Sequence, residues 1–177
     1  MSFLQIIYAP NEIFTQKAQP VEEVDDEVRD VLQMMFKTLE IENGIGLGAN
    51  MVGFLNRMIV VDWFDGGERF AMVNPEITYK SEETQEFEEA SLSFPGISAK
   101  ITRPKKIKVK YLDEQGKEQS KEAEGFLATL IQHEIDYLDG VVFLDYLSKL
   151  KRERLLKKMD KHMKKYPPHI HGKHCNH

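Results

Sequence analysis

Cysteine is almost absent from this 177-residue chain, whose one cysteine is Cys175. Without a second cysteine no internal disulfide can form, so the chain has no disulfide partner of its own. A metal site in the body of the fold that uses a thiolate ligand is excluded for the same reason.

Long hydrophobic runs are also missing. No stretch approaches the roughly 18 apolar residues that span a bilayer, and the first residues lack the basic start and small-residue cleavage site of a signal peptide. Hydrophobic residues make up 41% of the chain and charged residues 30%, which is typical of a globular protein. We therefore expect one cytoplasmic globular domain without a membrane segment.

Positive charge is scarce except at one end. The net charge is −5, but residues 149–177 carry ten Lys and Arg against two acidic residues, which gives +8 and leaves −13 on residues 1–148. We predict a body over 1–148, a basic helix over 149–166 packed on it, and a His-rich tail over 167–177. The basic helix could present a solvated face or bind phosphate backbones such as those of RNA.

Hydrophobic periodicity predicts helices at both ends and strands in the middle. We expect residues 44–50 to form an irregular glycine-rich loop and Asn74-Pro75 to break a strand. The first predicted helix is capped by Asp25 or Asp26 and ends at Asn43-Gly44, and two more cover about 125–140 and 150–166. The predicted strands cover about 57–64, 70–73, 77–88, 107–111 and 117–123, with a turn at 65–67 after the first.

The clearest indication of a metal-binding or catalytic site is a polar run on the helix predicted at 125–140. His133 and Tyr137 lie four residues apart on one face, with Glu134 about 100° round the helix. In the H-E-x-x-H metal helix, two histidines at this spacing hold a metal and the glutamate acts on bound water. Here Tyr137 replaces the second histidine, and a lone histidine on an apolar helix is more often a structural residue.

Three segments together resemble the peptide deformylase family. Residues 44–51 are GIGLGANM, residues 89–93 are EASLS, and residues 132–140 are QHEIDYLDG. The family shows G-h-G-L-A-A-x-Q, E-G-C-L-S and Q-H-E-x-D-H-L-x-G in this order. The resemblance spans about residues 3–166 and implies an α+β fold, with antiparallel sheets around a central motif-bearing helix and helices at the N- and C-terminal ends.

The resemblance also implies a hydrolase of protein biosynthesis. The family removes the formyl group from the initiator methionine of nascent chains. Its Fe²⁺ or Zn²⁺ is held by the motif cysteine and both histidines, and the glutamate is the general acid/base. The glutamine side chain and the backbone N–H of the motif leucine bind the developing oxyanion.

Several functions carry over from the family without change. His133 matches a metal ligand, Glu134 matches the general acid/base, and the backbone of Leu47 matches the oxyanion donor. Small and apolar residues would contact the methionine side chain of a substrate. We assign this role to Gly44, Ile45, Gly46, Phe94 and Leu130.

Three family positions have changed chemistry. Ser91 stands at the cysteine position, and its hydroxyl stays protonated and binds soft or borderline metals poorly. Tyr137 stands at the second histidine position, where a phenol with a pKa of about 10 must first lose its proton. Met51 stands at the glutamine position, and a thioether donates no hydrogen bond; losing one oxyanion donor costs roughly 10²–10³ in rate.

These changes predict a degenerate metal site. His133 is the one good ligand left, whereas a catalytic zinc site normally has three protein ligands. We therefore expect no metal in the core, and we predict a deformylase-like protein without ordinary deformylase activity. It would retain a groove for N-terminal (formyl)methionyl peptides or nascent chains.

Other hypotheses stay open at this stage. The chain could be an active deformylase or amidohydrolase that holds a divalent metal with an unusual ligand set, or an accessory protein that binds RNA, the ribosome or metal through residues 149–177. A serine-hydrolase site at Ser91 is disfavoured because Glu134 diverges from His133 on the helix. Instead, Ser91, His133 and Tyr137 could form a hydrogen-bonded cluster. Adventitious metal binding is expected at His169, His171, His174 and His177.

Overall fold

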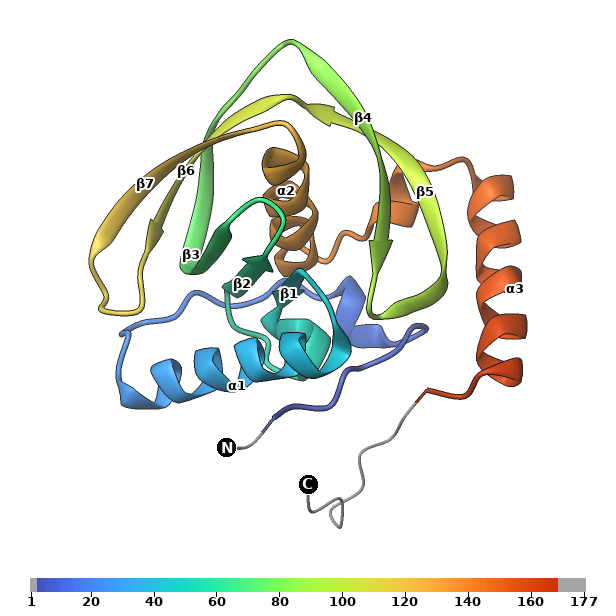
Figure 1. The fold of residues 1–177 in the computed structure, drawn as a ribbon, viewed down its shortest axis with the longest axis horizontal. Helices are drawn as coiled ribbons and strands as arrows, with labels where there is room; N and C mark the ends of the chain where they lie inside the picture. Colours follow the sequence, from blue (N-terminus) through green and yellow to red (C-terminus); the bar gives the residue numbers. More distant parts are fainter. Residues whose placement is uncertain (1–2, 169–177) are drawn as a thin grey trace.

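The computed structural model describes residues 3–168 and has the predicted α+β architecture (Figure 1). A five-stranded antiparallel sheet has the order β1-β2-β3-β6-β7, and β4 and β5 form a second, two-stranded sheet. The strands are β1 Gly46–Gly48, β2 Met58–Trp63, β3 Glu68–Lys80, β4 Thr84–Ser91, β5 Phe94–Pro104, β6 Lys106–Leu112 and β7 Glu118–Glu124. The helices are α1 Asp26–Glu42, α2 Phe126–Leu138 and α3 Lys149–Lys165, with short 3₁₀ turns η1 Glu12–Thr15, η2 Ala49–Val52 and η3 Phe143–Tyr146.

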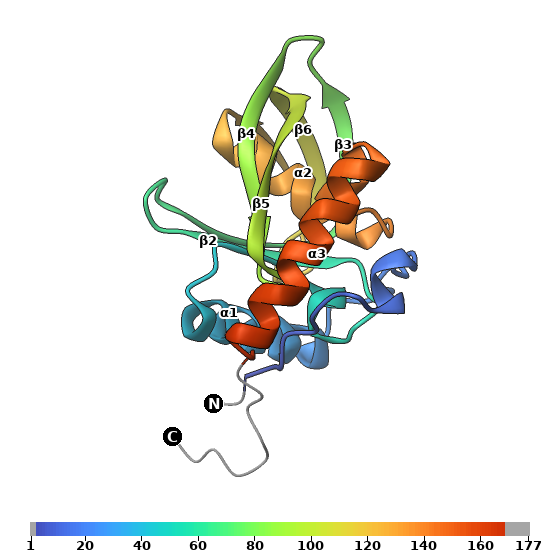
Figure 2. The same ribbon diagram turned by 90° about the vertical axis from the view of Figure 1, so that its right-hand side faces the viewer.

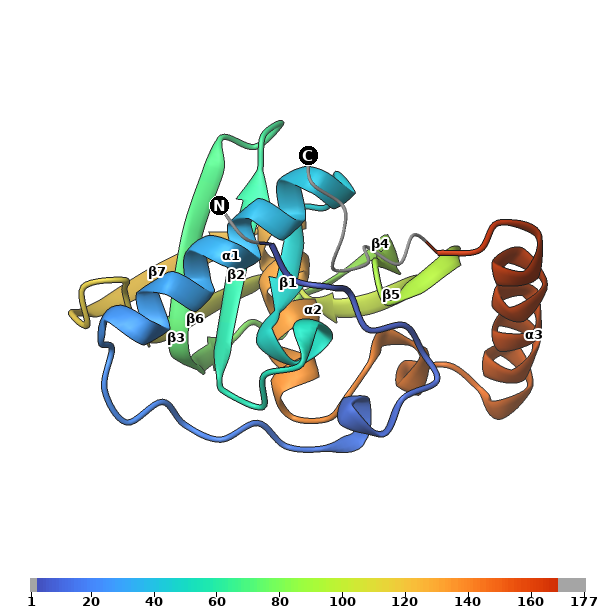
Figure 3. The same ribbon diagram turned by 90° about the horizontal axis from the view of Figure 1, so that it is seen from below.

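Strand β2 is buried on both faces, which explains its uninterrupted apolar sequence. Because successive strand residues point to opposite faces, Met58 and Val60 join one hydrophobic cluster while Ile59 and Val61 join another. Helix α1 covers the first face of the sheet, as Figure 3 shows, and α2 covers the second. The five-stranded sheet is therefore the central layer between two helices.

Helix α1 begins and ends where the sequence predicts. The Asp25 side chain caps its start by accepting a hydrogen bond from the Val28 backbone N–H, and the left-handed residue Asn43 ends it. Neither this helix nor any other within residues 3–168 is long and apolar enough to cross a membrane.

Two local predictions were wrong. Part of the glycine-rich segment predicted as a loop is strand β1, which pairs with β2 and leads directly into η2. Asn74-Pro75 does not end a strand: β3 continues to Lys80, and the pairing with β6 shifts register between Val73 and Glu76. The left-handed backbone of Asn74 absorbs this irregularity, since asparagine tolerates that conformation better than most residues.

The basic helix α3 lies along β5 (Figure 2). Its apolar side chains, including the buried Met159, pack against the larger hydrophobic cluster, while most of its nine Lys and Arg are exposed. RNA or ribosome binding by this helix stays a prediction. The predicted metal-binding tail, with His169, His171, His174 and His177, lies outside the described residues.

Gly96 fixes how closely α3 approaches β5. Its φ is +80°, and a Cβ atom there would overlap the His162 ring. We predict that Gly96→Ala lowers the free energy of unfolding in urea by about 2–4 kcal/mol, from left-handed backbone strain plus overlap. Gly67→Ala is the control, because a Cβ at Gly67 meets nothing within 4 Å and should cost only the strain, about 1–2 kcal/mol.

In the double variant Gly96→Ala/His162→Ala the overlapping ring is gone. The stability lost to overlap should therefore be recovered, while the stability lost to backbone strain is not. Equal losses in Gly96→Ala and Gly67→Ala would contradict this explanation of the α3 contact.

Candidate active site

The site forms where strand β4 lies against helix α2. Two residues of a strand advance about 6.7 Å and four residues of a helix about 6 Å, so alternate β4 side chains can meet successive turns of α2. The long Gln85 side chain donates to Thr129 Oγ1 at 2.9 Å. Two contacts follow the matched spacing: Glu89 with His133 at 2.8 Å, and Ser91 with Tyr137 at 2.6 Å. This matched spacing brings two of the three motif segments together.

His133 is held by a buried ion pair. Arg103 donates to both carboxylate oxygens of Glu89, at 2.7 and 2.8 Å, and Glu89 Oε1 lies 2.8 Å from His133 Nδ1. Burial alone would raise the pKa of Glu89, but hydrogen bonds from Arg103 and His133 outweigh it and lower that pKa. An ionised carboxylate has no proton to give, so His133 Nδ1–H is the donor. In the neutral imidazole, Nε2 is then an acceptor.

Arg103 also fixes the end of α2. It donates to Asp136 at 2.8 Å, and the Tyr146 hydroxyl donates to the same carboxylate at 2.6 Å. Burial, followed by the Asp136 hydrogen bond, raises the pKa of Tyr146 to about 12. Arg103 and Glu89 are each 4% exposed, so this network forms in a dry environment where its geometry is well defined.

The Ser91 and Tyr137 hydroxyls bond to each other rather than to His133. The Ser93 backbone N–H also donates to Ser91 Oγ, at 3.2 Å. Tyr137 is fully buried, and the His133 ring packs edge-on against it with centroids 5.5 Å apart. The three side chains therefore meet, but the hydrogen bonds divide them into a Ser–Tyr pair and a His–Glu pair.

Glu134 is 3% exposed and lies close to the imidazole of its neighbour. Its Oε1 is 3.9 Å from His133 Nε2, and within residues 3–168 neither Glu134 Oε2 nor His133 Nε2 has a hydrogen-bond partner. Burial, opposed in part by His133, raises the pKa of Glu134 to about 7. A carboxyl with this pKa can exchange protons near neutral pH.

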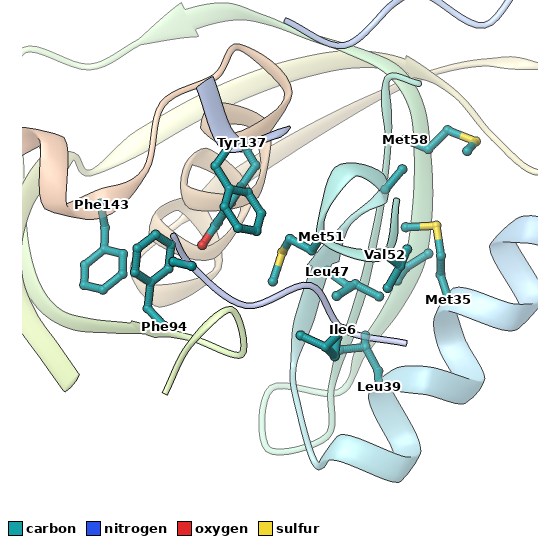
Figure 4. Close-up of a cluster of buried hydrophobic side chains, with 14 of the residues drawn as sticks. Ile6, Met35, Leu39, Leu47, Met51, Val52, Met58, Phe94, Tyr137 and Phe143 are labelled. Atoms are coloured by element: carbon teal, nitrogen blue, oxygen red, sulfur yellow. The ribbon is translucent and has the colours of Figure 1, made fainter. Parts of the chain in front are cut away.

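Met51 and Leu47 belong to the hydrophobic core (Figure 4). Met51 Sδ accepts a hydrogen bond from the Gly48 backbone N–H at 3.4 Å, and its side chain is 1% exposed. Leu47 is fully buried and pairs with Val60 in the sheet. Neither residue lines the cavity beside His133, whereas Leu92, immediately after Ser91, does.

That cavity has a volume of about 450 Å³. Of the residues assigned from the sequence, it is lined by Gly44, Ile45, Gly46, Ser91, Leu130, His133 and Glu134. Phe94 packs in the core against Phe14 and Phe143 and is not among the residues that line the cavity. Seven further lining residues were missed: Asn43, Glu88, Glu89, Ala90, Leu92, Phe126 and Thr129. All of them lie within or close to the three motif segments, so proximity to a motif was the signal in the sequence that could have identified them.

Glycine keeps the cavity open on the β1 side. A Cβ at Gly46 would lie 2.9 Å from Glu134 Oε1 and from Leu130 Cδ1, and one at Gly44 would lie 2.7 Å from Leu92 Cδ1. Side chains at these two positions would therefore crowd the residues that line the site.

Comparison with known proteins identifies the family. The family model for polypeptide deformylase matches residues 3–153. This chain belongs to the polypeptide deformylase family. A relative named peptide deformylase-like, from Rickettsia conorii, is 58% identical over 177 residues, covering 99% of this chain and 97% of that protein. The peptide deformylase of Phenylobacterium zucineum is 42% identical, covering 93% of this chain and 99% of its own length.

Solved deformylase structures have the same fold. The peptide deformylase of Ehrlichia chaffeensis superposes with a TM-score of 0.86 at 37% identity, covering 96% of this chain and 100% of that one. The enzyme of Legionella pneumophila gives 0.87 at 38% identity, covering 94% and 100%. The α+β fold implied by the motifs is therefore confirmed.

Deformylases use a divalent metal, but the donors present here do not fit one. Burial raises the pKa of Tyr137 well above its ordinary value, so the phenol keeps its proton near neutral pH. Ser91 offers a hydroxyl already bonded to Tyr137. Across residues 3–168, no three His, Cys, Asp or Glu side chains are grouped to hold a metal ion. His133 Nε2 is the one suitable donor among the three family positions.

We predict that Arg103→Met lowers the free energy of unfolding by about 3–5 kcal/mol, because it leaves the Glu89 carboxylate buried without its cation. Arg152→Met is the matched control: its pair with Asp145 is half-exposed and should contribute less than about 1 kcal/mol. Urea denaturation measures both, and equal effects would contradict the importance of the buried pair.

Glu134 makes stability depend on pH. Its folded-state pKa of about 7 lies above the unfolded value of 4.5, so the unfolded chain loses this proton first and stability falls as pH rises between the two. Glu134→Gln removes this loss. From about pH 4 to about pH 9, the stability of the variant relative to the parent should rise by about 3 kcal/mol. A constant difference in thermal denaturation across this range would contradict the buried-carboxyl account.

Proposed function

We propose that this protein binds peptides with an N-terminal methionine in the cavity beside His133 and lacks the ordinary metal-dependent deformylase reaction. The observation that carries this proposal is the Ser91–Tyr137 hydrogen bond, which joins the side chains at two of the three ligand positions of the family. A metal there would have to break this bond and ionise a fully buried phenol. Without a metal, no water is activated at neutral pH for amide hydrolysis.

The oxyanion position supports the same proposal. Met51 accepts a hydrogen bond from Gly48 and has no side-chain hydrogen to donate. Because transition-state stabilisation and activation of the nucleophile are separate requirements, the two losses multiply. A site that lacks both is expected to bind without turning over.

The cavity suits a methionine side chain. Ile45, Leu92 and Leu130 supply apolar surface, and Phe126 lies further along the wall. Strand β1 is at one end of the strand order, so one of its edges has no partner strand among the described residues. An extended peptide can pair with such an edge while its first side chain enters the cavity. The peptide deformylase of Ehrlichia chaffeensis has been solved in complex with actinonin.

A second candidate is an active deformylase with an altered ligand set. Its support is that His133 and Glu134 are retained with unpartnered atoms, and that Glu89 and Arg103 still orient the imidazole. In either case we propose that the protein acts in the cytoplasm, on nascent or newly made chains.

Hydrolysis of formyl-Met-Ala-Ser by the full chain separates the two candidates. We expect no turnover above background, with or without added Fe²⁺, Zn²⁺ or Ni²⁺. Turnover that requires one of these metals and is abolished both by a chelator and by Glu134→Ala would establish the second candidate and overturn our preference.

Restoring the three altered side chains should restore the chemistry. In the variant Ser91→Cys/Tyr137→His/Met51→Gln, we expect one Zn²⁺ or Ni²⁺ per chain and turnover more than about 10²-fold above the parent, because the ligands and the oxyanion donor return together. Ser91→Cys alone is the control and should bind no stoichiometric metal, since Tyr137 still occupies the second position. If the triple variant binds no metal, the loss is not confined to these three positions.

A further inference from the structure

Two side chains that line the cavity, His133 and Glu134, carry polar atoms without a hydrogen-bond partner among the described residues. His133 Nε2 and Glu134 Oε2 are both unpartnered within the described residues, and both side chains are at least nine-tenths buried, at 4% and 3% exposed. With Nδ1–H donated to Glu89, Nε2 of the neutral imidazole can only accept. A carboxyl group keeps acceptor capacity in either protonation state, so at least one oxygen of Glu134 accepts as well.

The charged residues that line the cavity are acidic. Glu88, Glu89 and Glu134 all line it, and none of its lining residues is Lys or Arg. Glu89 is compensated by Arg103, which lies behind it, while Glu88 is exposed near the opening. The local field therefore favours a positively charged group and disfavours an anionic one.

These acceptors suit an amine better than a formamide. A formyl group brings one N–H donor and a carbonyl oxygen, and Met51 has no hydrogen to give that oxygen. An α-ammonium brings three N–H donors and a positive charge, which can satisfy His133 Nε2 and Glu134 together. A formyl oxygen in a buried site would lack the side-chain donor lost at Met51, which costs affinity, whereas pairing the orphaned acceptors gains it.

We infer that the cavity selects peptides with a free N-terminal α-ammonium and an apolar first side chain over their N-formylated forms. His133 Nε2 and Glu134 bind the ammonium, and the wall formed by Ile45, Leu92 and Leu130 contacts the first side chain. This inference rests on the proposed peptide-binding function and specifies its ligand. The ligand has the chemistry of the product, rather than the substrate, of deformylation.

Binding of three matched peptides to the full chain tests the inference by isothermal titration in the presence of EDTA. The probes are Met-Ala-Ser-amide, its N-formyl form, and a desamino form in which hydrogen replaces the amine. We expect the free amine to bind at least about tenfold more tightly than either of the others, since a charge-assisted hydrogen bond at a buried site contributes on this scale.

The variant Glu134→Gln assigns the effect to this side chain. It should reduce affinity for the free amine by about tenfold or more. Affinities for the formyl and desamino peptides should stay within about twofold of the parent values, so the preference for the amine is lost. A purely structural role would weaken all three peptides equally. Glu86→Gln, on the exposed side of β4 and outside the cavity, is the matched control and should preserve the preference.

Each remaining outcome contradicts a different claim. If the formyl peptide binds as tightly as the amine or more tightly, the inference is wrong while the proposed peptide-binding function stands. A preference for the amine that survives Glu134→Gln would place the selectivity at other residues and overturn the assignment. If none of the peptides binds, the proposed function fails and the inference fails with it.

Discussion

The Ser91–Tyr137 hydrogen bond is the contact on which the account of this site depends. It lies at the end of β4, where Glu89 and Ser91 meet successive turns of α2 at His133 and Tyr137. Because that spacing is a property of the backbone, a serine and a tyrosine can occupy the positions of a cysteine and a histidine without disturbing the fold. The two polar groups satisfy each other at 2.6 Å, so burial of the phenol leaves no orphaned hydroxyl.

The polar side chains beside this pair still form the arrangement that would orient a metal ligand. Arg103 and Glu89 still hold the imidazole of His133, and Glu134 remains buried beside it with an unpaired oxygen. Leaving such atoms unpaired costs stability, which small proteins have little of. Their retention beside an open cavity is most simply explained by a ligand that supplies donors. The proposed loss of the metal and the proposed peptide site are therefore compatible in one structure.

Much of the fold could be predicted from the sequence because its signals are local. The cap at Asp25, the period of α2 and the turn after Trp63 depend on neighbouring residues only. Strand β5 was missed although Ile97, Ala99, Ile101 and Arg103 alternate with more exposed residues, because Pro95 and Gly96 near its start are typical of a turn. The shift of β3 past Asn74 was missed for a related reason: a proline normally ends pairing, and only the partner strand shows that it resumes.

The motif residues of the site could be located from the sequence, but not all of their directions. Phe94 stands beside a motif segment, yet its side chain packs in the core against Phe14 and Phe143. Glu89 was hidden in a run of glutamates; period-two alternation with Phe87 would have shown that it points inwards. That Ser91 bonds to Tyr137 and His133 to Glu89 could not be predicted from the sequence, because it depends on where the side chains point in space.

Anomalous diffraction from crystals grown with excess Zn²⁺ or Ni²⁺ tests the central claim most directly. The account predicts no anomalous peak at His133 Nε2, with the Ser91 and Tyr137 hydroxyls still within hydrogen-bond distance. A fully occupied peak coordinated by His133 and Ser91, with the Tyr137 hydroxyl bound to the ion or displaced from Ser91, would contradict it.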